Sequence, residues 1–275
     1  LGAGVILLLF TLFAKKKETF AVWKKPAEAV RLVIFAVGGL MFSQFAYLTA
    51  ISYSNSGTAT VFQNTGIILV MIISCILARR LPRGKEITAA VLTLIGVVLL
   101  ATHGRLDGLV ISGGALTWGG LAALALVTYT LLPGQLLKKW GTPLVNGFAM
   151  LIGGIVLAVA FRIWEKSWDF ELHIVLALLA MVILGTVIAF SFYLQGVADI
   201  GPVKASMLAC IEPVVATVIS ALCLGTEFAT IDLLGFALII GGCLLVSMSG
   251  EKDAQADAED APESARAVVS GADTE

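Results

Sequence analysis

Charged residues are scarce in this 275-residue chain, and their scarcity restricts the solvent in which it can fold. Only 13% of the residues are Asp, Glu, Lys or Arg, whereas 59% are hydrophobic. Because about a quarter of the residues of a soluble domain are charged, we infer that water is not the solvent for most of this chain. The net charge of -1 argues against a nucleic-acid partner, which would need a clustered basic surface.

Side chains that bind metals or act as nucleophiles are also few. The four cysteines lie inside apolar stretches without a C-x-x-C pair, and His103 and His173 stand apart near the ends of apolar runs. A metal or catalytic site needs several such groups close together. We therefore predict no catalytic residue, no metal and no cofactor, and we rank an intramembrane enzyme low among the possible functions.

Long apolar runs fill the chain up to residue 250. A helix needs about 20 consecutive apolar residues to cross a bilayer. The predicted spans are 32–51, 58–78, 87–102, 111–132, 144–163, 172–195, 203–224 and 231–249, with a partial span at 1–14. The sequence therefore predicts an all-α integral membrane protein.

The segment 251–275 differs from everything before it. It is rich in Ala, Asp and Glu and contains no apolar run, which predicts a disordered acidic tail. Most Lys and Arg residues fall in alternate linkers, at 15–31, 79–85, 138–139 and Lys204, whereas the opposite side receives Arg105, Arg162 and Lys166. Because Lys and Arg favour cytoplasmic loops, we expect the basic side and the tail to be cytoplasmic, in a multi-pass plasma-membrane protein.

The chain also contains a weak internal repeat. A shift of 146 residues aligns Tyr47-Leu48 with Tyr193-Leu194 and Gly96 with Gly242, without a gap. The basic linker at 79–85 then falls on a linker without Lys or Arg, which places equivalent loops on opposite membrane faces. We predict two inverted repeats of five spans each, at 1–104 and 105–250. The intact protein should then have ten spans, of which about eight and a half are present here, with the first helix missing upstream.

Several short motifs of the second half resemble a known family. They are Gly201 to Ser206, Ile211 to Val214, Leu224 to Glu227, and Gly235. This pattern is similar to the EamA-type transporters of the drug/metabolite transporter superfamily. The resemblance implies two five-helix repeats of opposite orientation and proton-linked or exchange transport of metabolites, often export. The first half departs from it, with Ile67 in place of Pro213 and Leu81 in place of Glu227.

Glu212 and Pro213 are the first candidates for chemistry. A carboxylate at a helix centre in lipid costs roughly 2.5 to 3.5 kcal/mol, so Glu212 should carry a proton, bind a cationic group, or stay neutral and bonded to a neighbouring helix. Pro213 has no amide hydrogen and leaves the carbonyl of Ala209 without a helical partner. That break either serves a binding site or is a packing kink.

Polar and aromatic side chains within the spans form a second set. Thr60, Gln63 and Asn64 share one helix face, which should point into the bundle. The other members of the predicted substrate or coupling site are Gln44, Tyr47, Trp118, Tyr129, Tyr193 and Gln195. Each residue either lines a cavity or makes an interhelical hydrogen bond, worth about 0.6 kcal/mol on average.

These residues and the resemblance together predict a secondary active transporter. It would export a small organic metabolite, such as an amino acid or a drug-like solute, by alternating access with possible proton coupling. The alternatives are a membrane scaffold that transports nothing and, ranked lower, an intramembrane enzyme. The expected partners are the small solute and the lipid bilayer, without nucleic acid, in a monomer or homodimer.

Overall fold

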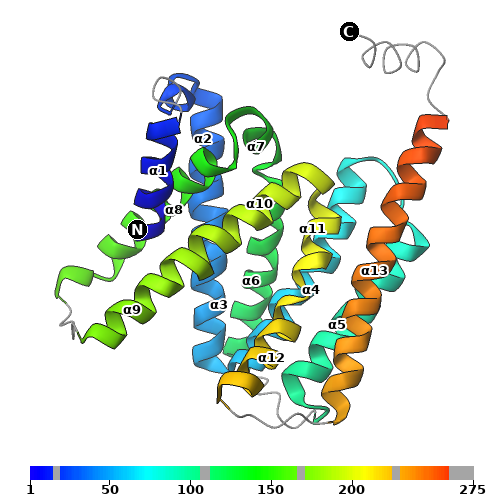
Figure 1. Cartoon of the computed structure of the whole chain (residues 1–275). Helices are drawn as coiled ribbons and strands as arrows, with labels where there is room; N and C mark the ends of the chain where they lie inside the picture. The colour runs from blue at the N-terminus through cyan, green and yellow to red at the C-terminus, as the bar shows by residue number, and fades with distance from the viewer. Residues whose placement is uncertain (15–18, 106–111, 166–170, 225–229, 260–275) are drawn as a thin grey trace.

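All regular structure in the described part of the chain is helical (Figure 1). The computed structural model describes residues 1–14, 19–105, 112–165, 171–224 and 230–259. Within these ranges, 8 helices are long and apolar enough to cross a membrane, and Gly2–Phe13 adds a shorter apolar helix. The predicted class, an all-α integral membrane protein, is confirmed.

The helices follow the predicted spans closely, and most extend past them because polar end residues continue the helix. The first half contains α1 Gly2–Ala14, the 3-10 turn η1 Ala21–Lys24, α2 Pro26–Ile34, the π-helical segment η2 Phe35–Met41, α3 Phe42–Tyr53, α4 Ser56–Leu77 and α5 Gly84–Thr102. The second half contains α6 Gly113–Leu131, α7 Gly134–Trp140, α8 Thr142–Ala160, the 3-10 turn η4 Ile163–Glu165, α9 Leu172–Ala180, the π-helical segment η5 Met181–Ile188, α10 Ala189–Ile200, α11 Pro202–Ala209, α12 Glu212–Leu224 and α13 Thr230–Glu259.

The last helix is longer than the sequence pattern predicts. Helix α13 continues to Glu259, past the boundary expected at residue 250. The added residues include Ala, Glu, Lys and Gln, which favour helix even in water. The rest of the predicted tail, from 260 onward, lies outside the described residues, as does most of the Leu224 to Glu227 motif.

The two halves repeat the same element boundaries. Four pairs of elements begin 146 residues apart: Pro26 and Leu172, Phe35 and Met181, Ser56 and Pro202, and Gly84 and Thr230. The second pair opens the two π-helical segments, η2 and η5. Because π-helical turns are rare, their equivalent positions support the alignment much more strongly than the residue identities do.

Helices α5 and α13, which are equivalent in the repeat, pack tightly together and run in opposite directions (Figure 1). A methyl group at Gly96 would lie 2.8 Å from the carbonyl oxygen of Gly235, and one at Gly242 would lie 3.0 Å from that of Ala89. Gly96 is the repeat mate of Gly242, and Ala89 is the mate of Gly235. This reciprocal antiparallel contact is what an inverted repeat requires.

A second contact lies close to the symmetry axis of the repeat. The thiol of Cys210 in α11 donates to the side-chain oxygen of Asn64 in α4 over 3.4 Å, and these two residues are 146 positions apart. A residue can touch its own repeat mate only near the two-fold axis. The α4 and α11 helices therefore cross at the centre of the pseudo-symmetric bundle.

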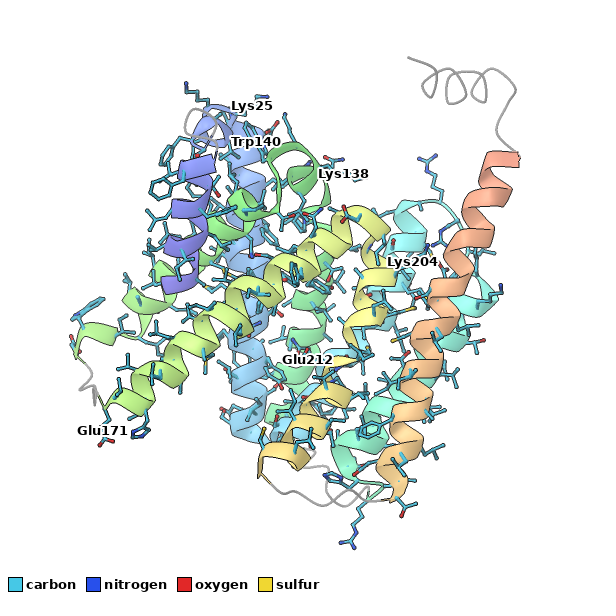
Figure 2. All side chains as sticks on the ribbon, in the orientation of Figure 1. Lys25, Lys138, Trp140, Glu171, Lys204 and Glu212 are labelled. Atoms are coloured by element: carbon cyan, nitrogen blue, oxygen red, sulfur yellow. The ribbon has the colours of Figure 1, made fainter. Side chains whose placement is uncertain are left out.

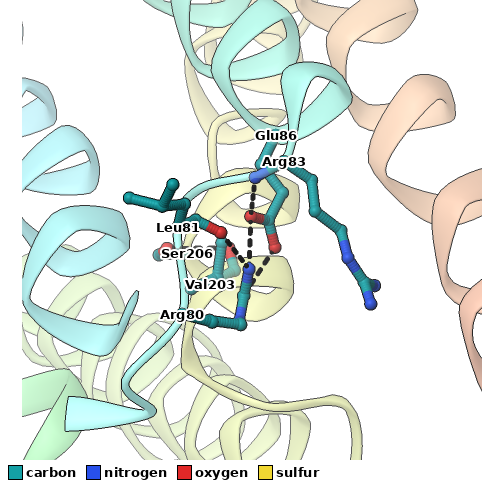
Figure 3. A network of polar contacts seen from close by, with 6 residues as sticks. All are labelled: Arg80, Leu81, Arg83, Glu86, Val203 and Ser206. Carbon is teal, nitrogen blue, oxygen red and sulfur yellow. Dashed lines mark hydrogen bonds and ion pairs between the residues drawn. The ribbon is translucent and has the colours of Figure 1, made fainter. Parts of the chain in front are cut away.

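The first turns of α5 and α13 carry equivalent acidic residues. Glu86 accepts two hydrogen bonds of 2.8 Å from Arg80 and one of 2.9 Å from the Arg83 amide (Figure 3). Its mate Asp232 is fully buried, 3.0 Å from Nδ1 of His103. His103, which stands alone in the sequence, therefore links the end of α5 to the start of α13.

The helix that contains Glu212 is interrupted within the membrane-spanning region. Helix α11 ends at Ala209 and α12 begins at Glu212. Pro213 has no amide hydrogen to donate to the Ala209 carbonyl, so the regular pattern cannot continue. The structure thus contains the break that the sequence predicts.

Backbone hydrogen bonds between residues three positions apart span the interruption. The amides of Cys210 and Ile211 each donate to the carbonyl three residues earlier, over 3.2 Å. In the first half, α4 runs unbroken through Ile67, the counterpart of Pro213. The break is therefore a departure from the two-fold symmetry, and it is confined to the second half.

Adding a methyl group at Gly242 should weaken the α5–α13 contact. In Gly242→Ala the new carbon would lie against Thr93 and the Ala89 carbonyl, whereas Gly241→Ala meets nothing within 4 Å. We expect Gly242→Ala to cost about 1 to 3 kcal/mol through overpacking, measured as a lower midpoint of thermal unfolding in detergent. Gly241→Ala should be neutral or slightly stabilising. Equal effects of the two substitutions would refute the close α5–α13 packing.

Replacing Pro213 should let α11 and α12 join. In Pro213→Ala the new amide can donate to the Ala209 carbonyl, and we expect slow hydrogen exchange there and a gain of up to about 3 kcal/mol in stability. Pro202→Ala is the control, because Pro202 begins α11 and its amide would have no helical partner. Rapid exchange at residue 213, with unchanged stability, would show that the break has another cause.

Candidate functional site

The ends of the bundle differ in charge, and Glu212 lies between them. Lys25, Lys138 and Lys204 lie toward one end, called here the lysine-rich end, and Glu171 lies at the opposite end (Figure 2). Glu212 is about 15 Å along the helix from Pro202, at 1.5 Å per residue. It therefore occupies the middle of its span, as the sequence predicts.

Glu212 has no protein partner in the described part of the chain. Its side chain is exposed and makes no hydrogen bond or ion pair with any described residue. As the first residue of α12, it stands next to the helix break and two positions after Cys210, which contacts α4. A free carboxyl group at this depth is open to water, a proton or a bound cation.

Helix α4, which carries Asn64, and the neighbouring helix α3 hold further polar side chains. Gln44 and Gln63 are half-buried, and their amides bond to no described residue. Tyr47 and Thr60 join the two helices through a hydroxyl contact of 2.9 Å. Asn64 is occupied, because it donates to the Thr60 carbonyl over 2.8 Å and accepts from Cys210. The two glutamines thus keep their hydrogen-bonding capacity, whereas Asn64 does not.

Trp118 places an aromatic ring on the α6 side of this region. It meets Phe45 of α3 edge to face at 5.6 Å, and its indole nitrogen has no partner among the described residues. Helices α4 and α6 approach closely here, since a methyl group at Gly119 would lie 2.6 Å from Cβ of Phe62. We call Gln44, Tyr47, Gln63, Trp118 and Glu212, which lie within the membrane spans of α3, α4, α6 and α12, the mid-membrane polar group.

Tyr129 and Tyr193 belong to a different environment. Their rings stack at 5.4 Å, Phe35 stacks on the other side of Tyr129 at 5.9 Å, and Phe190 meets Tyr129 at its edge. The Tyr193 hydroxyl contacts Thr130 at 2.8 Å. We call Phe35, Tyr129, Phe190 and Tyr193 the aromatic stack. Of the two alternatives left open by the sequence, a cavity-lining residue or an interhelical hydrogen bond, Tyr193 shows the second, and both rings pack in the core.

The Tyr129 hydroxyl is an exception within the stack. It is buried, and no described residue lies within hydrogen-bonding distance of it. A buried hydroxyl without a partner costs about 1 to 3 kcal/mol. The stack is therefore packed around one unsatisfied polar atom.

Gln195 lies away from the mid-membrane polar group. Its side-chain oxygen accepts from Thr142, the first residue of α8, over 2.7 Å, and its nitrogen donates to Asp199 over 2.9 Å. The oxygen thus joins α10 to α8 near the lysine-rich end, whereas the nitrogen bonds within α10. The structure thus gives Gln195 the helix-joining role, the alternative to a cavity-lining one.

Some residues that contact the candidate site residues could not be recognised from the sequence. Cys210 reads as a small apolar residue, although the 146-residue shift that pairs it with Asn64 was available as a signal. Phe35 and Phe190 lie in apolar runs rich in similar residues, and Thr130 shows no pattern at all. Only the packing of η2, α6 and α10 brings these three residues to the two tyrosines.

Comparison with known proteins agrees with this architecture. The EamA-like transporter family matches residues 1–102 and 114–248. The inner membrane transporter YicL of Salmonella typhimurium is 36% identical over 256 residues, covering 93% of this chain and 85% of the relative. The transporter YyaM of Bacillus subtilis is 26% identical, covering 88% of this chain and 79% of the relative.

A solved structure shares the fold. It is a crystal structure of a protein with 18% sequence identity, which superposes with a TM-score of 0.74 and covers 90% of this chain and 85% of that chain. At this identity the similarity concerns the fold alone. The two family matches, which together span almost the whole helical region, and the 36% identity to YicL show that this chain belongs to the EamA-like transporter family.

Proposed function

We propose that this protein is a secondary active transporter of a small organic solute in the plasma membrane. The observation that carries the proposal is the mid-membrane polar group beside the broken helix α11–α12. Polar side chains inside a membrane face a cavity or a partner, and Gln44, Gln63 and Glu212 have no described partner. Transporters commonly place their binding sites where a helix is interrupted between two repeats.

The chemistry of the group suits a polar solute with a cationic amine. Glu212 supplies a carboxylate, the two glutamines supply donors and acceptors, and Trp118 supplies an aromatic face that attracts a cation. In a low-dielectric environment an unpaired carboxylate favours its neutral form. Glu212 therefore holds either a proton or the cationic part of the solute, and exchange between the two would couple transport to protons.

The aromatic stack supports a closed barrier toward the lysine-rich end. It joins η2, α6 and α10, since Phe35 is the first residue of η2, and it borders η5, because Phe190 follows that segment by two residues. Segments of this kind often lie at functional sites. We propose that the stack opens during alternating access and that the Tyr129 hydroxyl then gains a partner.

We propose that this state opens toward the opposite end, which contains Glu171. The helix segments α9 and η5 contain no buried residue, and Ile211 and Val215 near the break are exposed. This looser packing supports the proposed direction of opening. Because Lys and Arg favour the cytoplasm, we assign the lysine-rich end and the C-terminus to the cytoplasmic side, and the family resemblance makes export the proposed direction.

A panel of solutes should identify the ligand class through thermal stabilisation. A true ligand at about 100 times its dissociation constant stabilises the protein by about 2.7 kcal/mol, seen as a higher unfolding midpoint. Gln63→Ala should weaken binding about tenfold, whereas Gln135→Ala, at the lysine-rich end where Gln135 contacts Arg31, should not change it. Equal stabilisation of both variants would place the ligand elsewhere.

The proton-coupling role rests on Glu212. We expect Glu212→Gln to fold normally but to transport at a rate independent of pH in proteoliposomes, because glutamine cannot take up or release a proton. Glu171→Gln, which removes an exposed carboxylate at the end of the bundle, should keep the pH dependence of the wild type. An unchanged pH profile in Glu212→Gln would remove Glu212 from coupling.

A further inference from the structure

A cluster of charged and aromatic side chains lies at the lysine-rich end, away from the mid-membrane polar group. Two ammonium groups lie over the Trp140 ring at the end of α7, Lys25 at 5.6 Å and Lys139 at 5.7 Å from its centroid. Its indole nitrogen donates to Glu28 over 2.6 Å, and Glu28 forms an ion pair with Lys139. Residues from before α2, from α2 and from α7 thus meet at one ring (Figure 2).

This cluster carries more positive than negative charge. Glu28 supplies one carboxylate for the two ammonium groups. The pKa of Lys25 is lowered by the Lys139 side chain, which lies in direct contact with it and repels it as a like charge. Arg31 adds a guanidinium held by the amide oxygen of Gln135, which is neutral. An anion placed at Lys25 and Lys139 would relieve this repulsion.

The depth of the cluster is that of lipid headgroups. It lies at the start of the span Pro26–Tyr53 and at the end of the span Gly113–Trp140. The neighbouring segment exposes Phe20 and Trp23, and both rings are held against Phe148 of α8, at 5.9 and 5.4 Å. Exposed tryptophan at this position is typical of the boundary between hydrocarbon and headgroups. An anion here would therefore sit above an apolar, lipid-facing surface.

We propose that Lys25, Lys139 and Trp140 form a binding site for the phosphate of an anionic phospholipid headgroup. Basic pockets between helices on the cytoplasmic side are known to recognise such headgroups. The two ammonium groups come from different helical segments and are positioned by the same ring. A bound phosphate would thus link the start of α2 to the end of α7.

The chain offers closely matched variants for a test. Lys25→Gln removes the ammonium group that lies over Trp140, whereas Lys24→Gln removes the same charge one residue earlier. Trp140→Leu removes the ring that positions both lysines and leaves the net charge unchanged. The full chain is placed in nanodiscs of phosphatidylcholine, with or without phosphatidylglycerol. Retained lipid is measured by native mass spectrometry, and stability by thermal unfolding.

We expect phosphatidylglycerol to be retained by the wild type and to raise its unfolding midpoint. Lys25→Gln should weaken the retention about fivefold, as expected for one charge near the membrane surface, and Trp140→Leu should weaken it similarly. Lys24→Gln should change it about twofold or less. If Trp140→Leu fails to fold, the difference in lipid retention between Lys25→Gln and Lys24→Gln is sufficient to test the proposal.

Three results would overturn the proposal. The first is a wild type that phosphatidylglycerol does not stabilise. The second is an equal loss in Lys24→Gln and Lys25→Gln, which would indicate general surface attraction without a site. The third is stabilisation of the wild type by inorganic phosphate in pure phosphatidylcholine discs to the same extent as by phosphatidylglycerol, which would assign the site to a soluble anion.

Discussion

The hydrogen bonds of the backbone are the constraint on which the rest of this structure depends. In hydrocarbon, every amide and carbonyl needs an internal partner, so continuous helices are the default. Among the described residues, the departures from this default include the π-helical segments η2 and η5 and the break between α11 and α12. The first two border the aromatic stack, and the third adjoins Glu212. The irregular backbone therefore coincides with the regions to which we assign gating and binding.

The inverted repeat explains how such irregularities are tolerated. Glycine contacts hold α5 and α13 together as an antiparallel, pseudo-symmetric pair. Asp232 joins the start of α13 to His103 at the end of α5, whereas its mate Glu86 bonds to Arg80 and Arg83 at the start of α5. The Asn64 and Cys210 contact fixes the crossing of α4 and α11 near the axis. Pro213 interrupts only the second of the two equivalent helices. Its counterpart in the first half, α4, is continuous and packs against α11.

Much of the fold could be predicted because its signals are local. The spans follow from apolar runs, and the 146-residue register follows from a few matched residues and from the charges of the loops. The break at Pro213 needs only the missing amide hydrogen. The site was less predictable: the depth of Glu212 came from its place in a span, but Tyr129 and Tyr193 stack in the core and Gln195 joins two helices.

The sequence by itself determined the membrane class, the order of the spans and the repeat, because burial in lipid depends on each segment's own composition. It also placed a carboxyl group and a helix break at mid-depth. Only the tertiary structure decided which polar side chains found partners, since a hydrogen bond depends on distances between helices that lie far apart in the chain. That is why Asn64 and Gln195 have partners on other helices while Gln63 and Glu212 remain free among the described residues.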